Sequence, residues 1–170
     1  ILALPARAIK SKNNAWLIHQ DFSQLGNRAN KEVLEALKNG VNSISFDFDD
    51  LVSNTNLLDC VYQNMIRINV NCTPENVLDA KFEPTTKDLD FSNEWSGISL
   101  DVFGDKDVSN NLIIKSIRKI MSASFFRLKL NLSVFAEAGF GPIDTLALAT
   151  LKMEQLLSFC EEAGMNAEEV

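Results

Sequence analysis

Three carboxylates stand together at the end of an alternating apolar segment. Asp47 closes the run V-N-S-I-S-F-D, and Asp49 and Asp50 follow after one Phe. Two aspartates spaced in this way at a strand end are typical of magnesium-dependent phosphatases, in which Asp47 would attack phosphorus and Asp49 would protonate the leaving group. Such enzymes carry Thr or Ser four residues after the nucleophile, where this chain has Leu51. Two interpretations stay open: a small phosphatase-like enzyme that uses Asp47 and Asp49, with Asp101 at another strand end, or solvated acids that cap the segment from Leu51 onward.

His19 is the single histidine of the sequence and lies next to the apolar run A-W-L-I. A metal cage needs further His or Cys ligands at short spacing, and none accompanies His19, so no metal site is predicted. If this segment is a strand of a barrel, His19 can contact a substrate from the lumen. The alternative is a half-buried histidine whose hydrogen bonds are satisfied within the protein.

A glycine-bearing turn, E-A-G-F-G-P, precedes a long helical pattern. Gly139 and Gly141 allow positive φ angles, and free N–H groups at the start of the following helix could hold an anionic group of a substrate. The alternative is a tight turn without a ligand. The sequence contains no G-x-G-x-x-G, G-x-x-x-x-G-K-[ST] or G-x-S-x-G motif, so dinucleotide, P-loop and hydrolase-elbow sites are not predicted.

The composition is that of a soluble globular protein of one domain: 170 residues, of which 46% are apolar and 23% charged. The 16 basic and 23 acidic side chains give a net charge of −7, which argues against nucleic acid and anionic lipid as partners. No apolar run has the roughly 18 residues of a membrane span, and the apolar-then-basic start reverses the order of a secretory signal. Three widely spaced cysteines favour free thiols in a reducing cytoplasm. The first residue is Ile rather than Met, which indicates a piece of a longer protein.

The hydrophobic pattern alternates between short apolar runs and amphipathic helical stretches. This order, with connections of crossover length, predicts the α/β class, with a parallel sheet and helices outside it. A complete eight-unit barrel takes roughly 250 residues, so five units predict a partial or truncated TIM-type (β/α) barrel that spans residues 1–170. The predicted strands are 15–20, 41–48, 65–70, 98–102 and 126–134, and the predicted helices are 28–39, 54–63, 75–80, 110–123 and 142–163.

Two segments together resemble the cobalamin-dependent methylmalonyl-CoA mutases. The first is A-W-L-I-H-Q-D-F with R-A-N-K-E-V-L-E-A-L-K-N-G-V-N-S-I-S-F-D-F, which is similar to the start of the substrate barrel in that family. The second is L-K-L-N-L-S-V-F-A-E-A-G with the helix after it and E-E-A-G-M-N-A-E-E-V, which is similar to a late barrel strand and its helix. The two segments occur in the family's order and cover nearly the whole chain.

The positions that do chemistry in the family differ in this chain. Its catalytic chains carry a Tyr-His pair shortly before the E-A-G turn, whose His contacts the thioester carbonyl, and the positions matched to it are Ser133 and Val134 here. In the first strand, the family's Thr, Arg and Tyr contacts to the CoA ester are matched by Leu17, His19 and Asp21. The resemblance therefore implies the small, non-catalytic subunit of the heterodimeric enzyme, with His19, Gly139 and Gly141 as the remaining candidates for substrate contact.

The resemblance also implies a reaction, a cofactor and a partner for the assembled enzyme. The assembled enzyme interconverts succinyl-CoA and methylmalonyl-CoA with adenosylcobalamin, and the partner would be the catalytic large subunit, or a second copy through an exposed sheet edge. The chain lacks the D-x-H-x-x-G motif of the cobalamin domain, so it is expected to bind no cofactor itself. A CoA-ester binding remnant is the third interpretation, with a possible basic site for the CoA tail near Arg7, Lys10 and Lys12.

Overall fold

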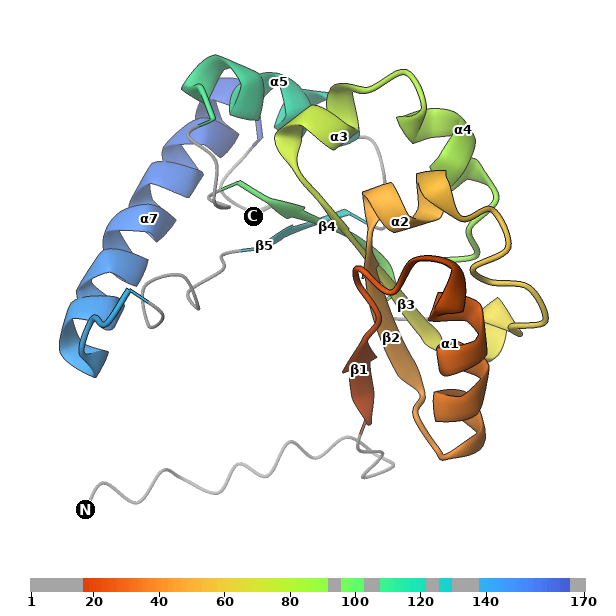
Figure 1. Ribbon diagram of the computed structural model, residues 1–170. Coiled ribbons are helices and arrows are strands. Elements are labelled where there is room, and N and C mark those ends of the chain that lie inside the picture. The colour runs from red at the N-terminus through yellow and green to blue at the C-terminus, as the bar shows by residue number, and fades with distance from the viewer. Residues whose placement is uncertain (1–16, 92–95, 103–107, 122–125, 130–137, 166–170) are drawn as a thin grey trace, which may run out of the picture.

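A computed structural model describes residues 17–91, 96–102, 108–121, 126–129 and 138–165. Five parallel strands form one sheet in the order β1-β2-β3-β4-β5, the same as their order in the chain (Figure 1). The described part of the chain is therefore of the α/β class, as the sequence predicts. The strands are β1 His19–Asp21, β2 Ser43–Asp47, β3 Arg67–Cys72, β4 Gly97–Asp101 and β5 Phe126–Lys129. The helices are α1 Ala29–Lys38, α2 Phe48–Ser53, α3 Pro74–Leu78, α4 Phe82–Lys87, α5 Asn110–Ile120 and α7 Pro142–Ala163.

The sequential strand order decides where the helices lie. Crossovers between parallel strands are almost always right-handed, and in a sheet with sequential order they all proceed in the same direction, so the connecting helices are expected over one face of the sheet. Figure 1 shows α1 to α4 on one side of the strands. The sheet consequently has one face covered by helices and a second face without a helical layer among the described residues.

The strand sequences alternate to match these two faces. On β3 every second residue is buried, and the register pairs apolar residues of neighbouring strands, such as Val70 with Phe46 and Ile98. These side chains form the helix face of the sheet and the centre of the core. The helix face consists of Ile44, Phe46, Ile68, Val70, Cys72, Ile98 and Leu100, each at most 2% exposed.

The register aligns the remaining strand residues into rows on the opposite face. His19 pairs with Ser43, and Ser43 with Arg67; the next row runs from Asp21 through Ser45 to Asn69. None of the residues in these rows has a large apolar side chain. We call this set the polar face of the sheet, and it consists of His19, Asp21, Ser43, Ser45, Asp47, Arg67, Asn69, Asn71, Gly97, Ser99 and Asp101.

Local sequence signals explain how the main helices begin and end. The first turn of α3 is fixed by a capping box, in which Thr73 accepts a hydrogen bond from the Asn76 N–H and Asn76 Oδ1 accepts one from the Thr73 N–H. Pro142 occupies the first turn of α7, where its missing N–H costs nothing, and Gly164 ends that helix with φ +98°. The predicted bounds 142–163 are confirmed.

Two predictions for the crossovers are wrong. Residues 54–63 do not form a helix: the Leu57 N–H bonds to the Asn54 carbonyl and the Asp59 N–H to the Asn56 carbonyl, so the segment is a succession of tight turns. The Asn54 side chain also accepts from the Asn56 N–H, which is the local competition that disfavours asparagine in helices. The helix after β2 instead starts at once, as α2, and a further short helix, α4, lies between the predicted helix 75–80 and the predicted strand 98–102, where no element is predicted.

The other predicted elements agree in position and differ at their ends. The predicted helices 28–39, 75–80 and 110–123 correspond to α1, α3 and α5. The strands 41–48, 65–70 and 98–102 correspond to β2, β3 and β4 within two residues. The predicted strand 15–20 corresponds to β1 at its end, and 126–134 to β5 at its start. Residues 15–16, 122–123 and 130–134 lie outside the described residues.

Candidate functional site on the polar face

His19 is the centre of a hydrogen-bonded cluster between β1 and β2. Its Nδ1 lies 2.9 Å from Ser43 Oγ, and its Nε2 lies 3.2 Å from Ser45 Oγ. Ser45 Oγ in turn donates to Asp21 Oδ1 at 2.8 Å, and Ser23 Oγ donates to the same oxygen at 2.9 Å. Because His19 and Asp21 are exposed and Ser43 and Ser45 are buried beneath them, the cluster presents its imidazole and carboxylate to the open side of the sheet.

The hydrogen count in this cluster fixes the tautomer of the imidazole. An ionised carboxylate only accepts, so the single hydroxyl proton of Ser45 is used on Asp21. Ser45 Oγ must then accept from His19, which places a proton on Nε2. In the neutral ring Nδ1 is left as an acceptor for the hydroxyl of Ser43. Both ring nitrogens are thus engaged within the protein, which agrees with the satisfied-histidine interpretation, while its exposure keeps the ring edge in reach of a polar ligand.

Asp47 lies one row further toward the carboxyl ends of the strands. The Asn71 Nδ2–H donates to Asp47 Oδ1 at 3.5 Å, a long hydrogen bond. Burial raises the pKa of the Asp47 carboxyl above its usual value, and the charges of Asp21 and Asp50 raise it further, against hydrogen bonds from Ser23 and Asn71 that lower it. The ionised form of Asp47 is therefore less favoured than that of a free aspartate.

The three strand-end acids are held by different parts of the chain. Asp49 Oδ1 accepts from Asn76 Nδ2 at 3.0 Å, beside α3, whereas Asp50 Oδ2 accepts from the backbone N–H of Gln24 at 2.9 Å, in the loop after β1. Asp101 ends β4 and pairs in register with Lys129 of β5. Among the residues that the structure describes, no group of three or more His, Cys, Asp or Glu side chains is placed to hold a metal ion.

The glycine turn before α7 is described only from Ala138 onward. Gly139 has φ +85°, which only glycine adopts readily, and Gly141 is the residue before the helix. A Cβ built on Gly141 would lie 3.4 Å from Asp144 Oδ2. This carboxylate stands where the helix dipole would attract an anionic group, so the chain itself supplies the negative charge there. Ser133 and Val134 lie outside the described residues.

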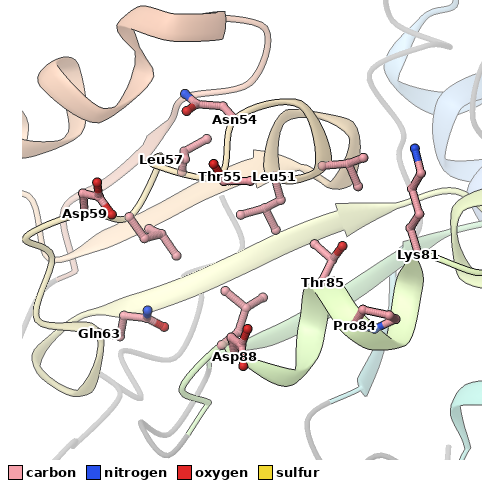
Figure 2. Close-up of a pocket in the computed structure, with 13 residues that line it drawn as sticks. Leu51, Asn54, Thr55, Leu57, Asp59, Gln63, Lys81, Pro84, Thr85 and Asp88 are labelled. Carbon is pink, nitrogen blue, oxygen red and sulfur yellow. The ribbon is translucent and has the colours of Figure 1, made fainter.

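A separate groove lies in the helical layer (Figure 2). It has a volume of about 520 Å³ and runs between the turns after α2 and helix α4. Leucines form its floor, among them Leu51 and Leu57, and the polar ends of Lys81, Asp59 and Asp88 stand around it. Several of its lining residues belong to the turns of residues 54–63. None of the sequence-predicted site residues lines it.

Sequence reasoning missed the partners that build the polar face. In the sequence, Ser43 and Ser45, and Asn69 and Asn71, are only polar residues that alternate with apolar ones. The signal that could have found them is the repetition of small hydrogen-bonding residues at alternate positions of consecutive predicted strands, which places them on one face once the strands are parallel and in sequential order.

The similarity searches do not identify this cluster with a known site. No protein-family model matches the chain, and no curated protein or solved structure matches it either. None of the helices in the described ranges has the length and apolarity needed to cross a membrane. The geometry alone therefore defines the candidate: an exposed His–Ser–Asp cluster on a sheet face that can exchange hydrogen bonds with water or a polar ligand.

Proposed function

We propose that the chain is a non-catalytic small subunit, or part of one, of an adenosylcobalamin-dependent methylmalonyl-CoA mutase. Its function would be to support the large subunit that interconverts succinyl-CoA and methylmalonyl-CoA. The observation that carries the fold part of this proposal is the sequential order of five parallel strands with an uncovered polar face. The subunit assignment is carried by the resemblance of the first and last segments and by the residues at the matched positions.

The strand order supports a TIM-type (β/α) barrel as the complete form of this domain. All-parallel sheets are nearly always covered on both faces, because both faces bury apolar residues. Here the second face carries no large apolar side chain, so a second helical layer has nothing to cover. A sheet with sequential strand order can instead curl until this face lines the inside of a barrel, and further βα units would complete it.

The residues at the matched positions support the proposal that this chain has no catalytic activity of its own. Neither Ser133 nor Val134 can supply the imidazole that contacts the thioester, and the two residues directly before Glu137 are Phe135 and Ala136, which lack one as well. Asp21, at the position of a family Tyr, is engaged by the hydroxyls of Ser23 and Ser45. The chain's own residues therefore do not reproduce the catalytic set.

The residues also do not fit a cobalamin. The sequence has no D-x-H-x-x-G motif, and its single histidine uses both ring nitrogens on Ser43 and Ser45, so it is not a free axial ligand. We assign the cofactor to the large subunit and the assembled enzyme to the cytoplasm. No chemical step is assigned to this chain.

The test is light scattering coupled to size-exclusion chromatography, on the chain alone and mixed with the mutase large subunit from the same source. A one-to-one complex is expected, with mutase activity that requires the large subunit. Turnover of methylmalonyl-CoA by the isolated chain, or the absence of any complex, would contradict the proposal. An unrelated acidic protein of similar size serves as the control for non-specific pairing with the large subunit.

A second candidate, a CoA-ester binding remnant, is favoured by the exposed cluster around His19. The Asp21 carboxylate could accept a hydrogen bond from an amide of a CoA ester, and the imidazole could bind the ester only by giving up Ser43 or Ser45; no reaction would follow. Calorimetry with succinyl-CoA distinguishes a chain that binds the CoA ester from one that only supports the large subunit. Heat of binding that disappears in His19→Ala would favour the remnant, whereas no heat at millimolar ester would exclude it.

A further inference from the structure

The groove beside helix α4 has walls that are fixed by hydrogen bonds from side chains to backbone. Asn30 of α1 donates from Nδ2 to the carbonyls of Leu57 and Asp59, at 3.0 and 2.9 Å, which holds the turns of one wall. At the other wall, Gln63 Oε1 accepts from the N–H of Asp90, shortly after α4, at 2.9 Å. These bonds join segments that are far apart in the chain, so the protein itself sets the shape of the groove. Its volume of about 520 Å³ is that of a small-molecule site.

Two carboxylates in the lining of the groove have no partner within the described ranges. Asp59 and Asp88 are exposed, and neither side chain forms a hydrogen bond or ion pair there. Lys81, the cation among the lining residues, is equally free, and Figure 2 shows it at the far end of the groove from Asp59. Leu51 and Leu57, both buried, lie between these two ends. The groove therefore combines an apolar floor with an excess of uncompensated negative charge.

The position of Asp88 gives a second reason to expect a cation. Helix α4 ends at Asp88, and the last carbonyl groups of a helix carry partial negative charge. A cation beside Asp88 is attracted by both, while the neighbouring Lys87 does not line the groove. An anion is disfavoured by the same charges and by the net charge of −7. The leucine floor favours an apolar body on the cation, because both apolar surfaces leave water when they meet.

We propose that this groove binds an organic cation, a primary amine or guanidine with a short apolar body. The charged group lies against Asp59 and Asp88, and the apolar body covers Leu51 and Leu57. Lys81 repels such a ligand, so the groove accepts molecules that carry their charge at the acidic end. This inference goes beyond the proposed function and does not depend on it, because none of the residues used for the mutase assignment lines the groove.

The test is a titration of the ¹⁵N-labelled chain with hexylammonium, followed by the backbone amide chemical shifts. Saturable shifts are expected at residues 54–59 and 85–89. Hexanol, which has the same apolar body without the charge, should bind more weakly, and hexanoate, which carries the opposite charge, should cause none of these shifts. Hexylammonium binding should weaken as the ionic strength rises, because salt screens the attraction between exposed charges.

Substitutions of the charged lining residues measure what each charge contributes. Asp59→Asn/Asp88→Asn should weaken hexylammonium binding about tenfold, and Lys81→Met, which removes a repelling charge, should strengthen it about twofold. The matched control is Glu154→Gln/Glu161→Gln, which removes the same charge from two exposed acids of α7, away from α4 in Figure 1. It should change binding less than about twofold. All the altered side chains are exposed, so unchanged urea unfolding midpoints should show that each variant is folded.

Three outcomes would overturn the inference. The absence of saturable shifts near the groove would show that it does not bind an amine. Equal binding of hexylammonium and hexanoate would show that the charge of the ligand is not recognised. Equal weakening in the two double variants would show that the net charge of the chain, rather than the groove, attracts the cation. The mutase proposal is tested separately, by complex formation with the large subunit.

Discussion

The two faces of the parallel sheet are built from the same strands and have opposite physical characters. On β3, Ile68 and Val70 are fully buried under the helices, whereas Asn69 and Asn71, one residue away, are partly exposed on the polar face. The same alternation holds on β2 and β4, except that the serines on the polar side of β2 and Gly97 on the polar side of β4 are buried as well. The sheet thus separates stability, which resides on one face, from hydrogen-bonding capacity, which resides on the other.

This separation shows what kind of site the chain can offer. Hydrophobic burial on the helix face is insensitive to which polar residues occupy the other face, so the polar face is free to vary. His19, Ser45 and Asp21 are held by hydrogen bonds to one another rather than by packing. Such a surface can host a ligand or line a barrel, and its replacement should cost far less free energy than any change on the helix face.

The largest loss in the free energy of unfolding is expected for substitutions on the helix face. Phe46→Ala removes a fully buried ring and leaves a cavity, so we expect the free energy of unfolding to fall by about 3–5 kcal/mol. Asn69→Ala, its matched control on the polar face of the neighbouring strand, should change it by less than about 1 kcal/mol. Urea unfolding followed by circular dichroism measures both. Similar losses for the two variants would contradict the separation of the faces.

Cys72 has an ionisable thiol on the helix face, so its titration shows whether water reaches this face. Burial, and then the charges of Asp49 and Asp47, raises the pKa of Cys72 from 9.0 to about 12. Because the folded pKa is the higher one, the thiol's contribution is fully present below pH 9 and is lost as the pH rises toward 12. Above pH 9 the unaltered chain should lose up to about 1.4 kcal/mol per pH unit more than Cys72→Ala.

Urea unfolding between pH 8 and pH 10.5 measures this loss, with Val70→Ala as the control. Val70 lies on the same face without a titratable group, so its variant should be less stable by a constant amount across the range. If the unaltered chain and Cys72→Ala have parallel pH dependences, water reaches the thiol and this part of the helix face is not dry.

The helix face could be predicted from the sequence because its signal is repetitive. Ile44, Phe46, Ile68 and Val70 alternate with polar residues, and that period specifies a strand and its buried side at once. Glycine at position 164 and proline at 142 marked the ends of α7 for equally local reasons. The turns at residues 54–63 escaped prediction because their apolar residues mimic a helix, while asparagine side chains bond to the nearby backbone instead.

The candidate site could be predicted only in part. His19 stood out as the single histidine, but its partners Ser43 and Ser45 come from a strand 24 residues later and meet it only through the register of β1 and β2. Register between parallel strands depends on packing of the whole sheet and leaves no mark at a single position. Likewise, the separation of Asp49 and Asp50 onto different neighbours follows from the position of α2, which the sequence pattern did not indicate.

Substitutions in the cluster around His19 should lower the free energy of unfolding by an intermediate amount. Ser45→Ala removes the hydroxyl that accepts from His19 Nε2 and donates to Asp21, leaving part of both groups without a partner in the protein. We expect a loss of about 1–2 kcal/mol in the free energy of unfolding. The ¹⁵N chemical shifts of the imidazole at neutral pH should show a proton on Nε2 in the unaltered chain. Ser43→Ala is the control that keeps this tautomer, and a proton on Nδ1 in the unaltered chain would refute the assignment.

The smallest change in the free energy of unfolding is expected at Asp47, where a substitution should stabilise the chain rather than destabilise it. Burial raises the pKa of this carboxyl, so its ionised form is disfavoured in the folded chain. The stability that the protonated form provides is present at acid pH and is lost as the pH rises through the folded pKa. Asp47→Asn, which keeps an acceptor for Asn71, should leave the free energy of unfolding at pH 7 equal or only slightly higher, because solvent screens the partly exposed carboxyl, and this difference should shrink toward pH 3. Asp47→Ala, which lacks the acceptor, is the control and should be destabilising. A loss of stability in Asp47→Asn at pH 7 would mean that the charge itself is favourable there, as a site for a cation would require, and the polar face would then hold a charge-dependent function beside the one proposed.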